Sequence, residues 1–163
     1  EIPKPMGSRH PSIAPFEAFK TKDSHIIIAA GNDKLFENLC NFLKISEISK
    51  DTKFITNSKR SENMDELKII LENKLKEKKT SEWVKGMEEL KIPCGPIFNI
   101  KEAVENPQIR ERNMIVKSFH KVVGEFRTAG NPIKMSSYND STTRGDIPDL
   151  DEHRDKIIKE FCN

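Results

Sequence analysis

The chain has 163 residues, of which 33% are charged and 35% are hydrophobic, and its mean hydropathy is −0.65. No apolar run approaches the roughly 20 residues that a transmembrane helix needs, so we expect no membrane insertion. The 28 basic and 26 acidic residues leave a net charge of +2, which provides no broad field for nucleic acid. The length predicts one compact unit.

The first residues predict a linker and then a β-hairpin. The sequence opens on Glu1 rather than Met and has prolines at positions 3 and 5, which suggests a piece of a longer protein. Residues 16–22 and 25–30 are typical of strands, and Asp23 and Ser24 between them favour a turn. A stop and a cap at Gly31-Asn32-Asp33 then precede apolar positions at helical spacing, which predict a helix over 33–44.

Two amphipathic helices are expected in the middle of the chain. After a loop around residues 50–52, Asn63 with Glu66 three positions later predicts a capping box. Thr80 or Ser81 is the predicted cap of the next helix, and Pro93 ends it. The apolar positions of the two helices are Met64, Leu67, Leu71 and Leu75, then Trp83, Met87 and Leu90. Such stripes are typical of core packing, so the two helices are expected to share an apolar layer.

The last third alternates short elements with polar segments. Residues 92–97, IPCGPI, predict a rigid turn and a short extended piece, followed by a helix over 101–105 that Asn106-Pro107 ends. Residues 114–120 and 125–129 are expected to be strands, and 136–148 to be irregular. Asp151 is the predicted cap of a final helix with Ile157, Ile158 and Phe161 on its apolar side. This order of elements predicts an α+β fold.

The cysteines and histidines indicate no metal site. Cys40, Cys94 and Cys162 are odd in number and lack paired spacing, as expected for reduced thiols in a cytosol-like compartment. Cys94 is either a nucleophile or a small turn residue, and the turn role is favoured because no neighbour would lower its pKa. The histidines are scattered without metal-ligand spacing, at positions 10, 25, 120 and 153.

A cluster of lysines lies where the first of these amphipathic helices should end. Its members are Lys74, Lys76, Lys78 and Lys79. Cations at a helix C-terminus interact favourably with the helix dipole, so a solvated helix end is favoured over a phosphate-binding patch.

A set of strings in fixed order carries a family resemblance. They are HPSIAPFEAFKTKD at 10–23, AAGND at 29–33, TN at 56–57 followed by Arg60, EW at 82–83, IPCGPI at 92–97, PQ at 107–108, GNPIK at 130–134 and LDEH at 150–153. With these strings the chain resembles the C-terminal part of the class III CoA-transferases, a group that includes formyl-CoA transferase and carnitine CoA-transferase. The resemblance runs from about Gly7 to the C-terminus.

The resemblance implies a particular division of the chain. Residues 1–12 would be a linker or loop from an absent Rossmann-like large domain, 13–135 a small α+β domain, and 136–163 a segment and helix that return to the large domain. In this family two chains interlock, and an aspartate in the N-terminal half attacks the acyl-CoA thioester. The present sequence contains no counterpart of that aspartate, so we expect no catalytic residue here.

The resemblance places one stretch near substrate. By position, the mobile loop that closes over the active site in formyl-CoA transferase matches the residues around Gly7, Ser8, Arg9 and His10. An arginine and a histidine on such a loop would suit a carboxylate substrate, and the alternative is an exposed linker. Two departures from the family pattern stand out: Asp23-Ser24 replaces an Asp-Gly turn, and Asp151 replaces a glycine.

These features together predict a piece of an acyl-CoA:carboxylate CoA-transferase that is inactive alone. The alternatives are an acyl-CoA racemase of the same superfamily and a non-catalytic dimerisation or lid module. The implied partners are acyl-CoA, a carboxylic acid and a second copy in an interlocked homodimer. No cofactor is expected beyond CoA thioester as substrate, and the expected location is the cytoplasm, or mitochondria in a eukaryote.

Overall fold

The computed structural model describes residues 4–162, and these divide into two compact units. Unit 1 ends at Ile97 and unit 2 begins at Phe98, whereas the length alone predicts a single unit. Unit 1 contains β1 (Phe16–Lys20), β2 (His25–Ala29), α1 (Asp33–Phe42), a 3-10 helix η1 (Ile48–Lys50), α2 (Asn57–Glu62), α3 (Met64–Leu75), α4 (Thr80–Glu89) and β3 (Cys94–Pro96). Unit 2 contains α5 (Ile100–Glu105), α6 (Pro107–Glu111), β4 (Ile115–His120), β5 (Gly124–Ala129), β6 (Thr143–Asp146) and α7 (Arg154–Phe161).

Unit 1 is built on a three-stranded antiparallel sheet in the order β1-β2-β3. The predicted hairpin is confirmed, with Phe16 opposite Ala29 and Lys20 opposite His25. The IPCGPI turn supplies β3, which pairs Ile28 with Cys94. Because β2 lies in the middle of the sheet, β1 is left with a free edge.

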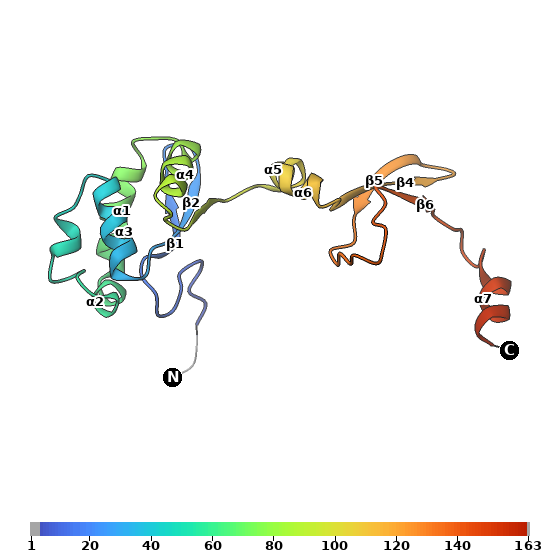
Figure 1. Cartoon of the computed structure of the whole chain (residues 1–163), viewed down its shortest axis with the longest axis horizontal. Coiled ribbons are helices and arrows are strands. Elements are labelled where there is room, and N and C mark those ends of the chain that lie inside the picture. Colours follow the sequence, from blue (N-terminus) through green and yellow to red (C-terminus); the bar gives the residue numbers. More distant parts are fainter. Residues whose placement is uncertain (1–3, 163) are drawn as a thin grey trace. The chain divides into compact units, whose positions relative to one another are not determined.

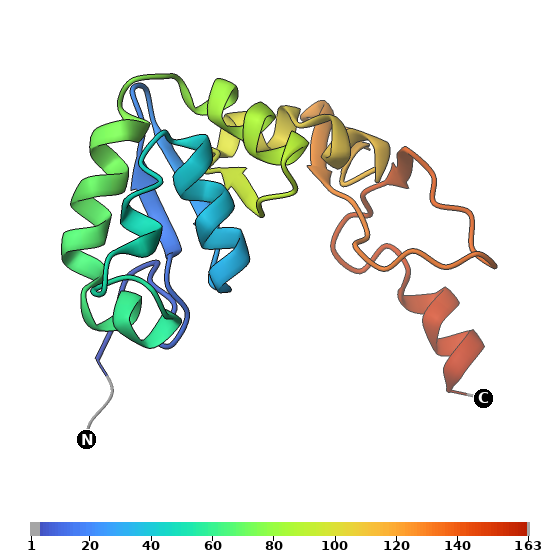
Figure 2. The same ribbon diagram turned by 60° about the vertical axis from the view of Figure 1, so that its left-hand side comes forward.

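The helices of unit 1 pack beside the hairpin and form one hydrophobic core (Figures 1 and 2). The predicted stripes are confirmed as core, with Trp83 only 4% exposed and donating from Nε1 to the carbonyl oxygen of Leu75 at 2.7 Å. Leu90 is the exception, because it lies just after α4 and is 47% exposed. The largest fully buried apolar side chains are Phe19, Ile26, Ile28, Phe36, Leu39, Phe54, Leu67, Leu71, Leu75, Met87 and Ile92.

A helix begins after Asn63 as predicted, but the predicted side-chain cap is absent. The Asn63 amide instead donates to the carbonyl oxygens of Lys53 and Lys59, at 3.3 Å and 2.9 Å, which joins α3 to the preceding α2. The capping box is therefore wrong, because Glu66 pairs with Lys53 at 2.8 Å. Lys79, rather than Thr80 or Ser81, is the residue before α4.

Unit 2 holds a second small sheet in the order β5-β4-β6. The predicted pairing of β4 with β5 is confirmed as antiparallel, with Ile115 opposite Ala129. Gly130 follows β5 and lies against the backbone, since a Cβ there would fall 1.9 Å from the carbonyl oxygen of Asn113. β6 was not predicted: it forms within the supposedly irregular segment and pairs in parallel with β4.

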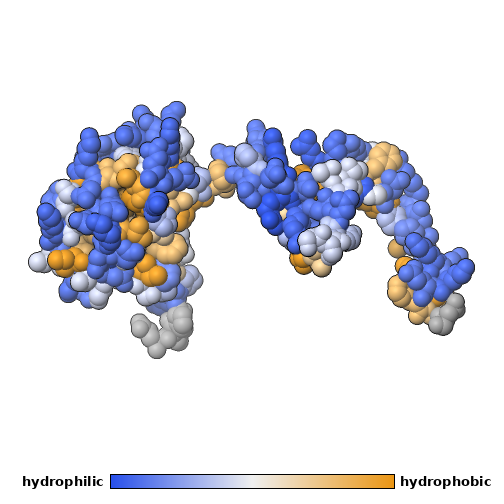
Figure 3. Space-filling view, viewed as in Figure 1, coloured by the Kyte–Doolittle hydropathy of each residue, from blue (hydrophilic) through white to orange (hydrophobic). Residues whose placement is uncertain are grey.

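Unit 2 has almost no core of its own among the residues that the structure describes. Val116 is its one buried large hydrophobic side chain, at 1% exposure. Hydrophobic surface, in orange in Figure 3, is visible on it. Its exposed large apolar residues are Phe98, Ile100, Val104, Phe119, Val122, Val123, Ile133, Met135, Tyr138, Ile147, Leu150, Ile157, Ile158 and Phe161. Within residues 4–162, no helix has the length and apolarity to cross a bilayer.

The predicted cap at Asp151 is wrong. Helix α7 begins at Arg154, and the residue before it is His153, whose side chain makes no capping hydrogen bond. Asp151 lies in the left-handed region with φ +70°, and its carboxylate accepts from Arg154 Nε at 2.7 Å. The family resemblance implies glycine at this position, and Asp151 thus occupies a conformation that glycine adopts more easily.

The predicted α+β fold class is confirmed. The division into a small domain at 13–135 and a returning segment at 136–163 concerns a longer protein and stays a prediction.

Candidate functional site around the Gly7–His10 loop

The predicted substrate-facing stretch forms a turn ahead of β1. Gly7 has φ +67°, in the left-handed region that favours glycine, and open space surrounds the position of a Cβ there. The backbone amide of Arg9 closes the turn by donating to the carbonyl oxygen of Met6 at 3.4 Å. Gly7 is exposed, so the turn presents bare backbone at this point.

The residues after this glycine bind along the free edge of β1. The amide of His10 donates to the carbonyl oxygen of Phe16 at 2.9 Å, and the hydroxyl of Ser8 accepts from the amide of Ala18 at 3.1 Å. These bonds satisfy backbone groups that an edge strand otherwise leaves open. Residues 8–10 are therefore docked on unit 1.

Arg9 is held between two carboxylates. Its Nε donates to Glu17 Oε1 at 3.0 Å, and a terminal nitrogen donates to Asp65 Oδ1 at 2.7 Å. The hydrogen bond to Asp65, together with the charge of Glu17, raises the pKa of Arg9. Glu17 has a side chain only 4% exposed and also pairs with Lys68. Because its guanidinium is already engaged, Arg9 secures the loop rather than offering a free fork to a substrate.

His10 has one ring nitrogen engaged in the loop. Its ring stacks on Phe16, with centroids 5.3 Å apart and planes 11° apart. Nδ1 accepts from the amides of Ser12 and Ile13, at 3.2 Å and 3.1 Å. A neutral imidazole whose Nδ1 is an acceptor carries its proton on Nε2. The half-buried His10 thus presents an oriented Nε2–H donor.

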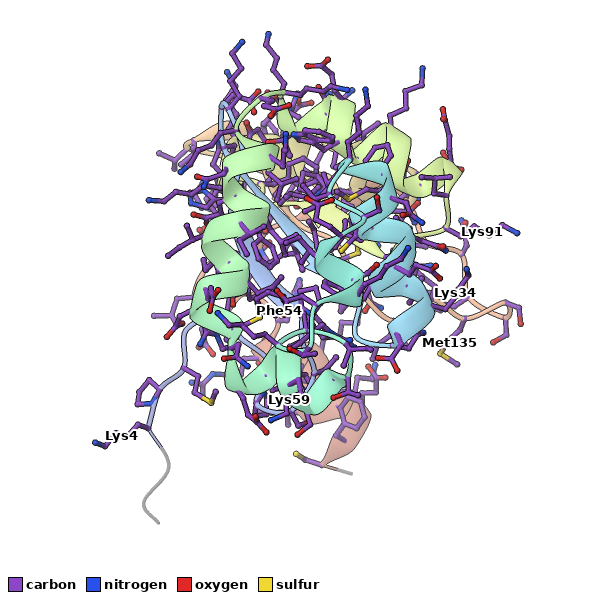
Figure 4. All side chains as sticks on the ribbon, turned by 90° about the vertical axis from the view of Figure 1, so that its left-hand side faces the viewer. Lys4, Lys34, Phe54, Lys59, Lys91 and Met135 are labelled. Carbon is purple, nitrogen blue, oxygen red and sulfur yellow. The ribbon has the colours of Figure 1, made fainter. Side chains whose placement is uncertain are left out.

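A buried arginine supports the backbone that follows the loop. Arg60 is 0% exposed, and its Nε donates to the carbonyl oxygen of Ala14 at 2.7 Å. Its terminal nitrogens donate to the carbonyl oxygens of Phe54, at 3.0 Å, and Gly31, at 2.7 Å. One of them also pairs with Asp33 Oδ1 at 2.9 Å. Phe54 marks this region in Figure 4, where it points into the interior of unit 1.

Asn57 completes this support. Its Oδ1 accepts from the amide of Ala14 at 2.9 Å, and its Nδ2 donates to the carbonyl oxygen of Ser12 at 2.8 Å. Gly31 is needed where the segments meet, because a Cβ there would lie 2.0 Å from Ile13 Cγ2. The strings at 10–23, 29–33 and 56–60 therefore meet around Arg60. This supporting role was not predicted, although the string TN at 56–57 followed by Arg60 was its visible signal.

Neither Cys40 nor Cys94 is activated as a nucleophile. Burial raises the pKa of the Cys40 thiol to about 12 and also raises that of Cys94. The half-buried Cys94 points its Sγ toward the carbonyl oxygen of Val84 at 3.9 Å. A raised pKa disfavours the thiolate that a nucleophile needs, which supports the turn role of Cys94.

The histidines lie on separate elements. His25 opens β2, His120 ends β4 and His153 precedes α7. Over residues 4–162, no three side chains of histidine, cysteine, aspartate or glutamate gather closely enough to hold a metal ion.

The α+β fold of this chain is shared by proteins of known structure. A CAIB/BAIF family protein from Brucella suis superposes with a TM-score of 0.78 at 33% identity, covering 98% of this chain and 41% of that one. Rv3272 from Mycobacterium tuberculosis shares the fold, with a TM-score of 0.76 at 24% identity over 86% of this chain and 39% of that one.

The sequence narrows this class to one family. The family model described as CoA-transferase family III matches residues 1–154, and the chain belongs to that family. It is 37% identical over 162 residues to the acetyl-CoA:oxalate CoA-transferase of Acetobacter aceti, covering 99% of this chain and 40% of that protein. It is 35% identical over 157 residues to human succinyl-CoA:glutarate CoA-transferase, covering 96% and 36%. The chain thus spans about 40% of the length of these relatives, and the predicted family resemblance is confirmed.

Proposed function

We propose that this chain is part of an acyl-CoA:carboxylate CoA-transferase, which moves CoA from an acyl-CoA to a carboxylic acid. The observation that carries the proposal is the family match over residues 1–154, together with relatives that are named as CoA-transferases. The names of those relatives pair an acyl-CoA with oxalate, glutarate or mesaconate, so a small dicarboxylate is the acceptor class to test first.

The proposed chemistry uses an aspartate that lies outside this chain. Its carboxylate attacks the thioester carbonyl, which releases CoA thiolate and leaves an acyl-aspartyl anhydride. The thiolate then attacks the aspartyl carbonyl, which releases the first acid and forms an aspartyl-CoA thioester. The acceptor carboxylate then attacks the aspartyl-CoA thioester, which releases CoA thiolate and forms a second anhydride. The thiolate attacks the acceptor carbonyl of that anhydride, which forms the new acyl-CoA and releases the aspartate. Covalent catalysis of this kind splits one difficult exchange into easier steps.

Within this scheme, the Gly7–His10 loop contributes to substrate binding. Gly7 leaves room for close approach to the backbone, and His10 Nε2–H donates to a substrate oxygen. Ser8 and Arg9 hold the loop against β1 through the contacts described above. A docked loop costs less ordering entropy when substrate binds, which favours a preorganised donor.

The proposal also includes a role for unit 2 in assembly with further chain. The exposed apolar side chains of unit 2 suit burial against further chain, as an interlocked homodimer with a large domain would provide. CoA enters as substrate and no other cofactor is proposed, and the location is proposed to be the cytoplasm or, in a eukaryote, mitochondria. The racemase alternative has less support, because the relatives described above are named as transferases.

The test is to express the complete reading frame and to follow acid-dependent exchange of CoA from acetyl-CoA and succinyl-CoA. We expect transfer to a dicarboxylate, and we expect His10→Ala to lower kcat/KM by about 10- to 100-fold, the loss of one hydrogen bond to a charged group. His153→Ala is the matched control and should change little. Deuterium exchange at the α-carbon of an acyl-CoA without any acid-dependent transfer would overturn the proposal in favour of a racemase.

A further inference from the structure

One end of unit 1 gathers basic side chains that the proposed transfer reaction does not use. The turn between β1 and β2 borders an open groove of about 430 Å³. It is lined by Lys20, Thr21, Lys22, Asp23, Ser24, His25 and Lys76. The sequence places only Lys76 in a basic cluster, whereas the fold adds Lys20, Lys22 and His25 from the hairpin.

Hydrogen bonds hold this turn in place. The amide of Thr21 donates to the carbonyl oxygen of Ser24 at 3.0 Å, which closes the turn. The amide of Lys22 donates to the carbonyl oxygen of Lys78 at 3.1 Å, which ties the turn to the loop between α3 and α4. The groove is therefore built from two segments far apart in sequence with a defined spacing.

Two acidic side chains at this end accept hydrogen bonds from backbone amides. Asp23 accepts from the amide of Thr80 at 2.9 Å and from its hydroxyl at 3.0 Å. The hydrogen bond from the Thr80 amide holds the pKa of Asp23 below its usual value. Glu72 accepts from the amide of Lys20 at 2.9 Å. Both carboxylates thus accept hydrogen bonds from the protein itself, Asp23 at the start of α4 and Glu72 at the edge of β1.

The ammonium groups are left facing solvent. Among the described residues, Lys20, Lys22 and Lys76 are exposed and have no carboxylate partner within 4.0 Å. Other lysines of the region differ, since Lys74 pairs with Glu77 at 3.2 Å and Lys78 lies over the ring of Trp83. The lining of the groove therefore holds three lysine ammonium groups against the single carboxylate of Asp23, on a chain whose net charge is only +2.

We propose that this groove binds the phosphate groups of a small phosphorylated molecule. Lysine ammonium groups act as point charges that suit phosphate, and three lysines around one groove attract a multiply charged phosphate more strongly than a singly charged carboxylate. The groove is lined by no phenylalanine, tyrosine or tryptophan for base stacking and by only seven residues, so a small ligand fits it better than a nucleic acid. This inference is independent of the proposed transferase function.

The test is an NMR titration of the 163-residue chain at low salt, with chloride at matched ionic strength as the blank. Tripolyphosphate and adenosine triphosphate serve as paired probes because they share the triphosphate group. We expect saturable shifts of the amides of residues 20–25 and 76, with a Kd of about 1 mM and a loss of binding as salt rises.

A matched pair of double variants makes the result specific. Lys22→Gln with Lys76→Gln should weaken binding at least 5-fold. Lys34→Gln with Lys59→Gln removes the same charge elsewhere and should not; Figure 4 labels both control residues, and Lys59 lies at the end of unit 1 away from the β1–β2 turn. Binding of both probes supports an organic phosphate ligand, and binding of tripolyphosphate alone supports an inorganic one. Equal weakening by both variants, or no saturable shift in folded protein, would overturn the proposal.

Discussion

At the scale of single residues, the loop depends on side chains that do not themselves face substrate. Arg60 satisfies three carbonyl oxygens and one carboxylate at once from a fully buried position. Only a planar fork with five donors can do this, and lysine in its place could not reach the same acceptors. The guanidinium also lies over the ring of Phe36, 4.6 Å from its centroid. One residue thus joins the segment after the loop to the start of α1.

Replacing Arg60 should therefore destabilise unit 1. Arg60→Met keeps much of the apolar bulk but leaves buried carbonyl oxygens without a donor. We expect the free energy of unfolding to fall by about 3 kcal/mol or more, measured by urea unfolding with Trp83 fluorescence. Arg154→Met, on the exposed face of α7, is the control and should stay within about 0.5 kcal/mol of the parent chain. Equal effects of the two variants would contradict the supporting role of Arg60.

The buried thiol of Cys40 should make the chain less stable at alkaline pH. Burial raises its pKa from 9.0 to about 12, so unfolding makes the thiol easier to ionise. The contribution is fully present below pH 9 and is lost as the pH rises from 9 toward 12. Between pH 9 and 10.5, the parent chain should lose about 1.5 kcal/mol more than Cys40→Ala. Parallel pH profiles of unfolding for the two proteins would show that the thiol is not held neutral.

At the scale of elements, hydrophobic periodicity predicted those helices and strands whose position depends on local sequence. The hairpin, α1 and the core stripes of α3 and α4 were predictable because spacing alone reports which face is buried. Asn63 and Asp151 were predicted as caps and are not, because the Asn63 amide bonds to the carbonyl oxygens of Lys53 and Lys59 and the Asp151 carboxylate bonds to Arg154. The parallel strand β6 was missed since its pairing with β4 depends on a long-range contact.

The candidate site was predictable only in part. The resemblance predicts residues 7–10 as substrate-facing, which stays a prediction, and it did not reveal that Ser8 and Arg9 are engaged with β1 and α3. Such contacts join residues far apart in sequence, and no local pattern records them. The role of Arg60 was hidden for the same reason.

Helix α7 should be weakly protected against hydrogen exchange in the isolated chain. Its apolar residues Ile157, Ile158 and Phe161 are between 49% and 74% exposed, so packing against the described part of the chain stabilises it little. A helix of 8 residues is marginal by itself. We expect fast exchange for α7 and slow exchange for the buried Ile26 and Ile28, in a sample shown to be monomeric. Equal protection in a monomer would mean that α7 packs on a surface within this chain.

At the scale of the whole molecule, the two units differ in how much of their apolar surface they bury. Unit 1 closes a complete core, and within residues 4–162 no buried side-chain polar atom lacks a hydrogen-bond partner. Unit 2 buries one large hydrophobic side chain and exposes many. Exposed apolar surface of this extent is typical of a region that packs against further protein. This asymmetry fits a chain that spans about 40% of the length of its relatives.

The isolated chain should consequently carry out no CoA transfer. The proposed mechanism needs an aspartate from outside this chain, and removal of a covalent nucleophile lowers rates by several orders of magnitude. The loop could at most bind substrate, since Arg9 is engaged and neither Cys40 nor Cys94 is activated. The measurement is exchange between succinyl-CoA and glutarate, with purified chain in one assay and the complete reading frame in another. We expect turnover only from the second. Turnover by the 163-residue chain that is abolished by His10→Ala would place the reacting groups within this sequence and would reject the external aspartate.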